Sequence, residues 1–140
     1  MNPKQTYFTV ESMPWMFPMG PDDYLQLLED VNRDRFSVHL DIFNWITTPQ
    51  RYFFQEAFIN ECFEKLGKHI KSCHLKDVKL EDDYTLFFRE TRVGNGGVDI
   101  KHLIETGVSF DKNMPFIIEH LETDEDYIKS ISDINKIMKA

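Results

Sequence analysis

Four short apolar runs along the chain predict buried β-strands. Each holds four to seven residues and is followed by polar residues, which is typical of strands in the interior of a parallel sheet. The predicted strands cover residues 7–10, 36–42, 70–75 and 115–118. The first strand leads directly into Glu11, and the second ends near Asp41.

A helical pattern follows each predicted strand, with apolar residues recurring at the spacing of an amphipathic helix. The predicted helices cover residues 22–31, 50–66, 99–105 and a segment that begins after Thr123. Gly67 and Gly107 are expected to close the second and third helices. The polar stretch after the third strand is expected to lead into a sharp turn at Gly94, Gly96 and Gly97. Four strand-helix units predict an α/β fold with one parallel sheet, whose strands lie side by side in chain order.

Length and composition indicate a single globular domain over residues 1–140. Hydrophobic residues make up 41% of the chain and charged residues 29%, and no linker or low-complexity tract divides it. The formal net charge of −8 disfavours nucleic acid and anionic membranes as partners. With two cysteines and no long apolar run, the sequence predicts a soluble, cytoplasmic protein with neither a disulfide framework nor a membrane span.

A residue able to bind a metal ion stands at the end of each predicted strand. These residues are Glu11, Asp41, His74 and Glu119. The carboxyl ends of neighbouring parallel strands lie at the same edge of a sheet, so side chains far apart in the chain are able to converge there. Three carboxylates and one imidazole suit Mn²⁺ or Mg²⁺, with Co²⁺, Fe²⁺ and Zn²⁺ as further candidates. The alternative is that these are ordinary loop residues that face water. His39 and His120 adjoin the set and are expected to pack around it rather than to bind metal.

Five segments of the chain resemble the sugar phosphate isomerase/epimerase family, the xylose-isomerase-like TIM barrels. In order, they are FTVESMPWMFP, VHLDIFNWITTPQRYF, ECFEKLGKHIKSCHLKD, ETRVGNGGVDI and PFIIEHLETDEDY. The resemblance spans nearly the whole chain and corresponds to the C-terminal half of the family's barrel. It implies a divalent metal held by Glu11, Asp41, His74 and Glu119. It also implies that Glu11 and Glu119 act as acid and base beside a carbonyl, through a metal-stabilised enediolate.

Three further residues are candidates for contacts with a substrate. Asn44 lies three residues after Asp41, where many relatives carry a histidine; this difference and the acidic charge disfavour an abasic-site endonuclease. Lys76, two residues after His74, either binds a hydroxyl or phosphate group of the substrate or is a solvated loop lysine. Trp15 either covers one face of a sugar or packs on its own barrel.

The chain supplies four of the eight strands that a closed barrel of this type needs. We expect such a half to have two unpaired strand edges and an apolar inner face, which favour association. The expected partner is a complementary N-terminal half-barrel or a second copy of the chain, although six carboxylates at one barrel mouth disfavour the second copy. Two functions stay open. The first is a sugar or sugar-phosphate isomerase or epimerase that needs an N-terminal half, and the second is a non-catalytic orphan or truncated half-barrel that binds metal or a partner.

Overall fold

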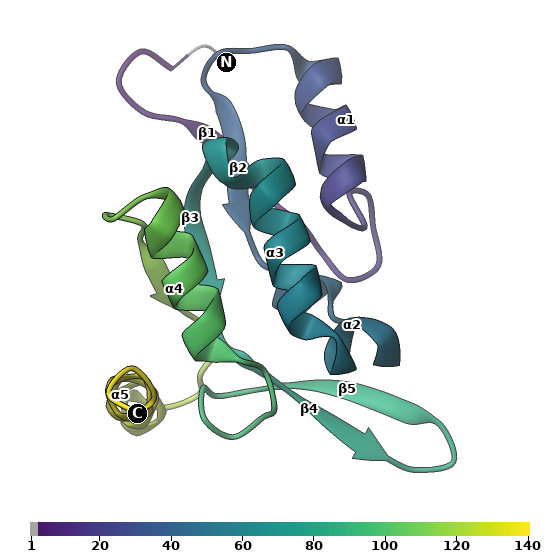
Figure 1. The fold of residues 1–140 in the computed structure, drawn as a ribbon, viewed down its shortest axis with the longest axis vertical. Helices are drawn as coiled ribbons and strands as arrows, with labels where there is room; N and C mark the ends of the chain where they lie inside the picture. The colour runs from purple at the N-terminus through teal and green to yellow at the C-terminus, as the bar shows by residue number, and fades with distance from the viewer. Residues whose placement is uncertain (1–2) are drawn as a thin grey trace.

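The computed structural model describes residues 3–140 and is built on a four-stranded parallel sheet (Figure 1). The strands lie in the order β1 (Phe8–Glu11), β2 (Phe36–Leu40), β3 (Ile70–Leu75) and β6 (Phe116–Ile118). Each neighbouring pair is parallel, with Glu11 opposite His39 in one pair and Cys73 opposite Phe116 in another. The predicted α/β half-barrel, with its strands side by side in chain order, is confirmed.

Helices cover one face of this sheet. Figure 1 shows α1 (Pro21–Val31), α3 (Gln55–Leu66) and α4 (Ile100–Phe110) side by side, and α3 contacts both of its neighbours. The remaining helices are α2 (Pro49–Phe53), α5 (Asp124–Ile137) and the 3-10 turns Phe43–Trp45 and Gly67–His69. Both cysteines lie as free thiols in the core between sheet and helices. Within residues 3–140, no helix is long and apolar enough to cross a membrane.

Side-chain caps begin two of the helices where the sequence predicts a start. Asp99 accepts a hydrogen bond from the backbone N–H of His102 and begins α4. Thr123 accepts one from the backbone N–H of Asp126 and begins α5. Each cap satisfies a backbone donor that has no partner within the helix.

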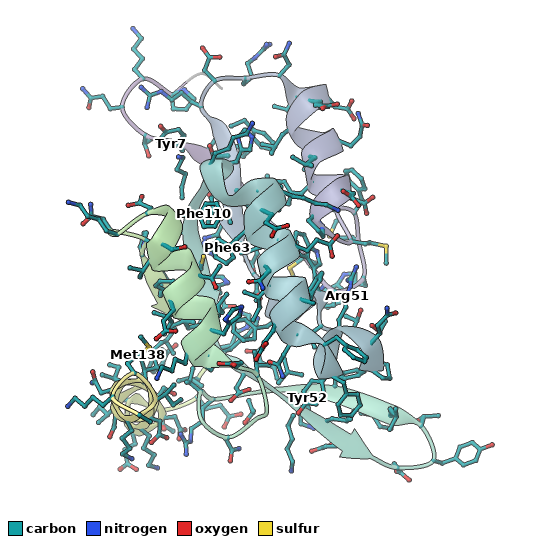
Figure 2. The ribbon with its side chains drawn as sticks, in the orientation of Figure 1. Tyr7, Arg51, Tyr52, Phe63, Phe110 and Met138 are labelled. Atoms are coloured by element: carbon teal, nitrogen blue, oxygen red, sulfur yellow. The ribbon has the colours of Figure 1, made fainter. Side chains whose placement is uncertain are left out.

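The predicted long second helix is broken, and this prediction is wrong. At Phe54 the backbone leaves the helical region, with φ −113° and ψ 38°, and separates α2 from α3. Tyr52 of α2 (Figure 2) packs against Phe88 in the segment that follows β3, with ring centroids 5.8 Å apart. Tertiary packing therefore overrides a continuous helical pattern at this point.

Gly107 does not close the third helix, which continues to Phe110. A Cβ atom at Gly107 would lie only 2.7 Å from the Phe116 ring. The glycine therefore allows α4 to pack closely on β6 instead of ending the helix. The added turn of helix brings Phe110 against Phe63 of α3, with ring centroids 5.6 Å apart (Figure 2).

An antiparallel hairpin follows β3, where the sequence predicts only a polar loop. It consists of β4 (Asp77–Asp82) and β5 (Leu86–Thr91) and extends beyond the ends of the covering helices (Figure 1). Charged residues face one another across it, as in the pair Lys79 and Arg89, and among the described residues of its two strands only Asp77 and Val78 are buried. Because neither face of the hairpin is buried as a whole, its sequence lacks the apolar alternation that identifies a strand.

Asp77 anchors the base of this hairpin to the glycine turn. Its Oδ1 accepts hydrogen bonds from the backbone N–H groups of Val78 and Val98, at 2.8 and 3.0 Å. Its Oδ2 accepts from Gly94 and Gly96, at 3.1 and 3.0 Å. A Cβ atom at Gly96 would lie 2.5 Å from the carbonyl oxygen of Val78, so the turn needs glycine there. The glycine turn thus closes over a buried carboxylate.

The face of the sheet opposite the helices is largely polar, and the prediction of an apolar inner face is wrong. In β2, Val38 and Leu40 belong to the core, so strand alternation places their neighbours on the opposite face. In β3, Cys73 belongs to the core and the same alternation applies. On this opposite face lie Ser37 and His39 of β2, Ser72 of β3 and Ile117 of β6.

Candidate metal and acid–base site

The four predicted metal ligands converge at the carboxyl ends of the parallel strands. One donor atom from each of Glu11, Asp41, His74 and Glu119 lies within 4.8 Å of the other three. The distances from His74 Nδ1 are 3.2 Å to Glu11 Oε1, 3.2 Å to Asp41 Oδ2 and 2.8 Å to Glu119 Oε1. Asp41 is fully buried and His74 is 8% exposed, so neither is a loop residue that simply faces water.

The sheet itself aims these side chains at one point. Glu11 ends β1, while Asp41 and Glu119 directly follow β2 and β6. Although β1 and β6 are the two outer strands, Glu11 and Glu119 both reach the Nδ1 atom of His74. The two glutamates therefore approach one imidazole from opposite edges of the sheet.

Lys76 is a buried member of this site, and its interpretation as a solvated loop lysine is wrong. Its side chain is 2% exposed. The Nζ atom lies 2.8 Å from Asp41 Oδ2, 2.9 Å from Glu119 Oε1 and 3.2 Å from Glu90 Oε2. An ammonium group has three N–H donors, so three carboxylates are enough to satisfy it.

Charge pairing shifts the pKa values within the site. Burial acts to raise the pKa of Asp41, but hydrogen bonds from His74 and Lys76 outweigh it and hold the pKa at about 2. Burial acts to lower the pKa of His74, and the surrounding carboxylates outweigh it and raise the pKa. For Glu11, burial raises the pKa, aided by Asp41 and Glu119 and opposed by His74. A carboxyl group with a raised pKa is suited to proton transfer near neutral pH.

Asn44 holds Glu11 in place. Its Nδ2 donates hydrogen bonds to Glu11 Oε1 at 3.2 Å and to the backbone oxygen of Ser12 at 3.0 Å. Its backbone N–H donates to Asp41 Oδ1 at 3.1 Å. Both amide hydrogens are thus engaged with the protein. Trp15, the third candidate for substrate contacts, lies in the loop after β1 with 73% of its surface exposed.

Glu90 and His120 extend the site toward the hairpin; the sequence predicts only a packing position for His120 and no role for Glu90. His120 Nδ1 lies 3.0 Å from Glu90 Oε1, and His120 Nε2 lies 3.4 Å from Glu119 Oε2. His120 has a φ of 56°, which is uncommon for a residue other than glycine. The only signal for Glu90 was its place at the start of the segment ETRVGNGGVDI.

His39 lies beside the four-donor set on the inner face of the sheet. The His39 and His74 rings meet edge to face, with centroids 4.0 Å apart. His39 Nδ1 is hydrogen-bonded to Ser72 Oγ. Burial and the nearby His74 lower the pKa of His39 to about 4, so the imidazole is neutral near pH 7. This placement of His39 agrees with the expectation that it packs around the site.

The donor set fits a divalent cation. Three carboxylates and one imidazole present four donors at the carboxyl ends of four strands, and oxygen-rich sets of this kind suit hard or borderline divalent ions. The carboxylates carry more negative charge than Lys76 balances, so an added positive charge is electrostatically favourable here.

Solved structures with the same fold support the architecture. A xylose isomerase-like TIM barrel protein from Mycobacterium smegmatis, solved in complex with magnesium, has a TM-score of 0.69 and 17% identity. A xylose isomerase domain protein from Planctomyces limnophilus has a TM-score of 0.69 and 21% identity. The probable 3-DHS dehydratase AsbF from Bacillus anthracis, involved in petrobactin synthesis, has a TM-score of 0.65 and 16% identity.

The match covers nearly all of this chain but less than half of each neighbour. It spans 95%, 95% and 96% of this chain, against 43%, 45% and 49% of those structures in the same order. A search of curated proteins finds no match. The sequence model of the xylose isomerase-like TIM barrels matches residues 2–137, so the chain belongs to that family.

Proposed function

We propose that this chain carries the metal-binding and proton-transfer site of a divalent-metal-dependent sugar or sugar-phosphate isomerase or epimerase. The observation that carries the proposal is the approach of Glu11 and Glu119 to His74 Nδ1 from opposite edges of the sheet, at 3.2 and 2.8 Å. An isomerase or epimerase of this kind removes a proton from a carbon and returns a proton from another side. This reaction requires two carboxyl groups on opposite sides of one point.

In this proposal, Glu11 and Glu119 are the proton relays, and their neighbours orient them. One glutamate takes the proton next to the substrate carbonyl, and the other returns a proton. Asn44 fixes the Glu11 carboxylate through its Nδ2, and Lys76 fixes Glu119 through its Nζ. Both supporting residues are at least nine-tenths buried, which keeps the carboxylates pre-oriented.

Glu11, Asp41, His74 and Glu119 would hold the divalent cation, with Mn²⁺ or Mg²⁺ preferred and Co²⁺, Fe²⁺ or Zn²⁺ as further candidates. When bound, such a cation supplies positive charge to meet the negative charge that develops on a substrate oxygen.

Lys76 and Trp15 are the proposed substrate contacts. The three carboxylates around Lys76 differ in exposure, since the Asp41 side chain is 0%, Glu119 15% and Glu90 36% exposed. A substrate hydroxyl or phosphate oxygen would therefore replace Glu90, the most accessible of the three. Trp15 is free to cover one face of a sugar ring. Asn44, proposed from the sequence as a third contact, offers a substrate its carbonyl oxygen, while its amide group donates to Glu11 and to the backbone oxygen of Ser12.

Isotope exchange tests the catalytic role of Glu119. In the complete barrel with Mn²⁺, solvent deuterium should enter a ketose substrate at the carbon that exchanges its proton. Glu119→Gln keeps the shape of the side chain but removes the titrating group, so exchange should fall by at least about 100-fold. Glu125→Gln, in the exposed first turn of α5, is the matched control and should exchange at the wild-type rate.

Two results would contradict the proposal. If Glu119→Gln exchanged deuterium as fast as the wild type, Glu119 would not be a relay. If a complete barrel with bound Mn²⁺ exchanged no deuterium into any ketose or ketose phosphate, the non-catalytic half-barrel would become the better account.

We further propose that the sheet is completed by a complementary half-barrel, in the same polypeptide or another. The outer strands β1 and β6 each leave one edge without a strand neighbour within residues 3–140. Tyr7 and Phe8 beside one edge are 41% and 46% exposed, and Ile117 in the other strand is 45% exposed. Unpaired strand edges with exposed apolar side chains favour pairing with another strand.

Sedimentation of the 140-residue chain at micromolar concentration checks this proposal. We expect the chain to associate when it is alone and to form a defined heterodimer when an N-terminal half-barrel is added. A monomer that sediments as one species and unfolds cooperatively by itself would show that the half-barrel needs no partner.

A further inference from the structure

His39 lies where it can act as a metal ligand in its own right. It faces Glu11 across the β1–β2 pair and Ser72 across the β2–β3 pair. Side chains opposite one another in neighbouring strands point to the same face of the sheet, so His39 lies between these two residues on the inner face. Its ring also contacts that of His74.

These positions create a second set of donors that overlaps the first. One donor atom from each of Glu11, His39 and His74 lies within 4.8 Å of the other two. Ser72 Oγ is hydrogen-bonded to His39 Nδ1, so Nε2 is the ring nitrogen that would bind a cation. A hydrogen bond to the other ring nitrogen is what orients the histidine ligands of most metal sites.

The chemistry of this second set differs from that of the first. Two imidazoles and one carboxylate form a nitrogen-rich set that suits Zn²⁺, and catalytic zinc sites use three such ligands with a fourth position open. The first set, with three carboxylates and one imidazole, favours Mn²⁺ or Mg²⁺. The two sets share Glu11 and His74, so a cation in one takes donors from the other.

We propose that Glu11, His39 and His74 form a second, overlapping cation site that binds Zn²⁺ and excludes Mn²⁺ from the four-donor site. In this proposal, Zn²⁺ binding depends on His39, whereas Mn²⁺ binding depends on Asp41 and Glu119. This inference concerns metal binding alone and does not rest on the proposed sugar chemistry.

Calorimetric titration with Zn²⁺ and with Mn²⁺ separates the two sites. His39→Gln should lower Zn²⁺ affinity at least about tenfold and leave Mn²⁺ affinity within about twofold of the wild type. Asp41→Asn should lower Mn²⁺ affinity at least about tenfold and leave Zn²⁺ affinity within about twofold of the wild type. His69→Gln, a histidine on the 3-10 turn before β3, is the matched control and should change neither affinity. Circular dichroism of each variant without metal checks that the fold is retained.

X-ray absorption at the zinc edge gives a readout that does not depend on affinity. The wild-type chain with one equivalent of Zn²⁺ should show two imidazole ligands per zinc. A single imidazole per zinc would overturn the proposal, because Zn²⁺ would then occupy the four-donor set. Equal losses of Zn²⁺ and Mn²⁺ affinity in His39→Gln, or no loss of either, would also overturn it. Deuterium exchange at the wild-type rate in Glu119→Gln would contradict the proposed proton relay but would leave these metal-binding results unchanged, so the two proposals fail separately.

Discussion

Asp77→Asn is expected to destabilise the fold by about 2–5 kcal/mol. The amide NH₂ group would replace one carboxylate oxygen and face two backbone N–H donors, either Val78 and Val98 or Gly94 and Gly96. Asp77 is 2% exposed, and Val78 and Val98 are buried beside it, so water does not replace an acceptor that is lost on their side. A buried donor without a partner costs about 1–3 kcal/mol, and two backbone N–H donors lose their acceptor in this variant. Urea unfolding followed by circular dichroism measures the difference.

Asp99→Asn is the matched control for this substitution. Asp99 accepts a hydrogen bond from the backbone N–H of His102 as the N-cap of α4, and asparagine caps helices about as well as aspartate. The control should therefore unfold close to the wild-type urea midpoint. Equal stability of the Asp77 and Asp99 variants would show that the buried carboxylate does not hold the glycine turn.

Lys76→Met is expected to lower the free energy of unfolding of the metal-free chain by about 3–5 kcal/mol. Lys76 neutralises Asp41 and Glu119, and removal of one partner from a buried ion pair leaves uncompensated charge. A divalent cation in the four-donor site would supply the compensating positive charge in place of Lys76. Saturating Mn²⁺ should therefore reduce the loss of stability, and Mn²⁺ should bind more tightly to the variant than to the wild type.

Lys79→Met, three residues further along the chain in β4 and 56% exposed, is the control and should change stability by about 0.5 kcal/mol or less. A Lys76 variant as stable as this control would contradict the buried ion-pair network. A loss of stability that is the same with and without Mn²⁺ would show that Lys76 and the metal do not act on the same carboxylates.

The positions of Glu11, Asp41, His74 and Glu119 could be predicted from the sequence because two simple rules place them. Apolar runs identify the strands, and parallel strands bring their carboxyl ends to one edge. The order of the strands follows from the same pattern. The polar inner face also has a signal in the sequence, because Ser37 and His39 alternate with the apolar residues of β2 with a period of two.

The hairpin and the ion pairs it supports could not be predicted in this way. Among the described residues of β4 and β5 only Asp77 and Val78 are buried, so the sequence of these strands carries no alternating burial pattern. Glu90 reaches Lys76 only because the hairpin folds back, and Lys76 becomes buried only because three carboxylates from different elements surround it. Contacts of this kind depend on tertiary structure, which local patterns do not contain.

Titration of the chain with Mn²⁺ by calorimetry tests most directly whether Glu11, Asp41, His74 and Glu119 bind one divalent cation. The wild type should bind one Mn²⁺, and His74→Ala should lower the affinity at least about tenfold while circular dichroism shows the same fold. His69→Ala should bind Mn²⁺ as the wild type does. Equal Mn²⁺ affinity in the wild type and His74→Ala would contradict the assignment of the site.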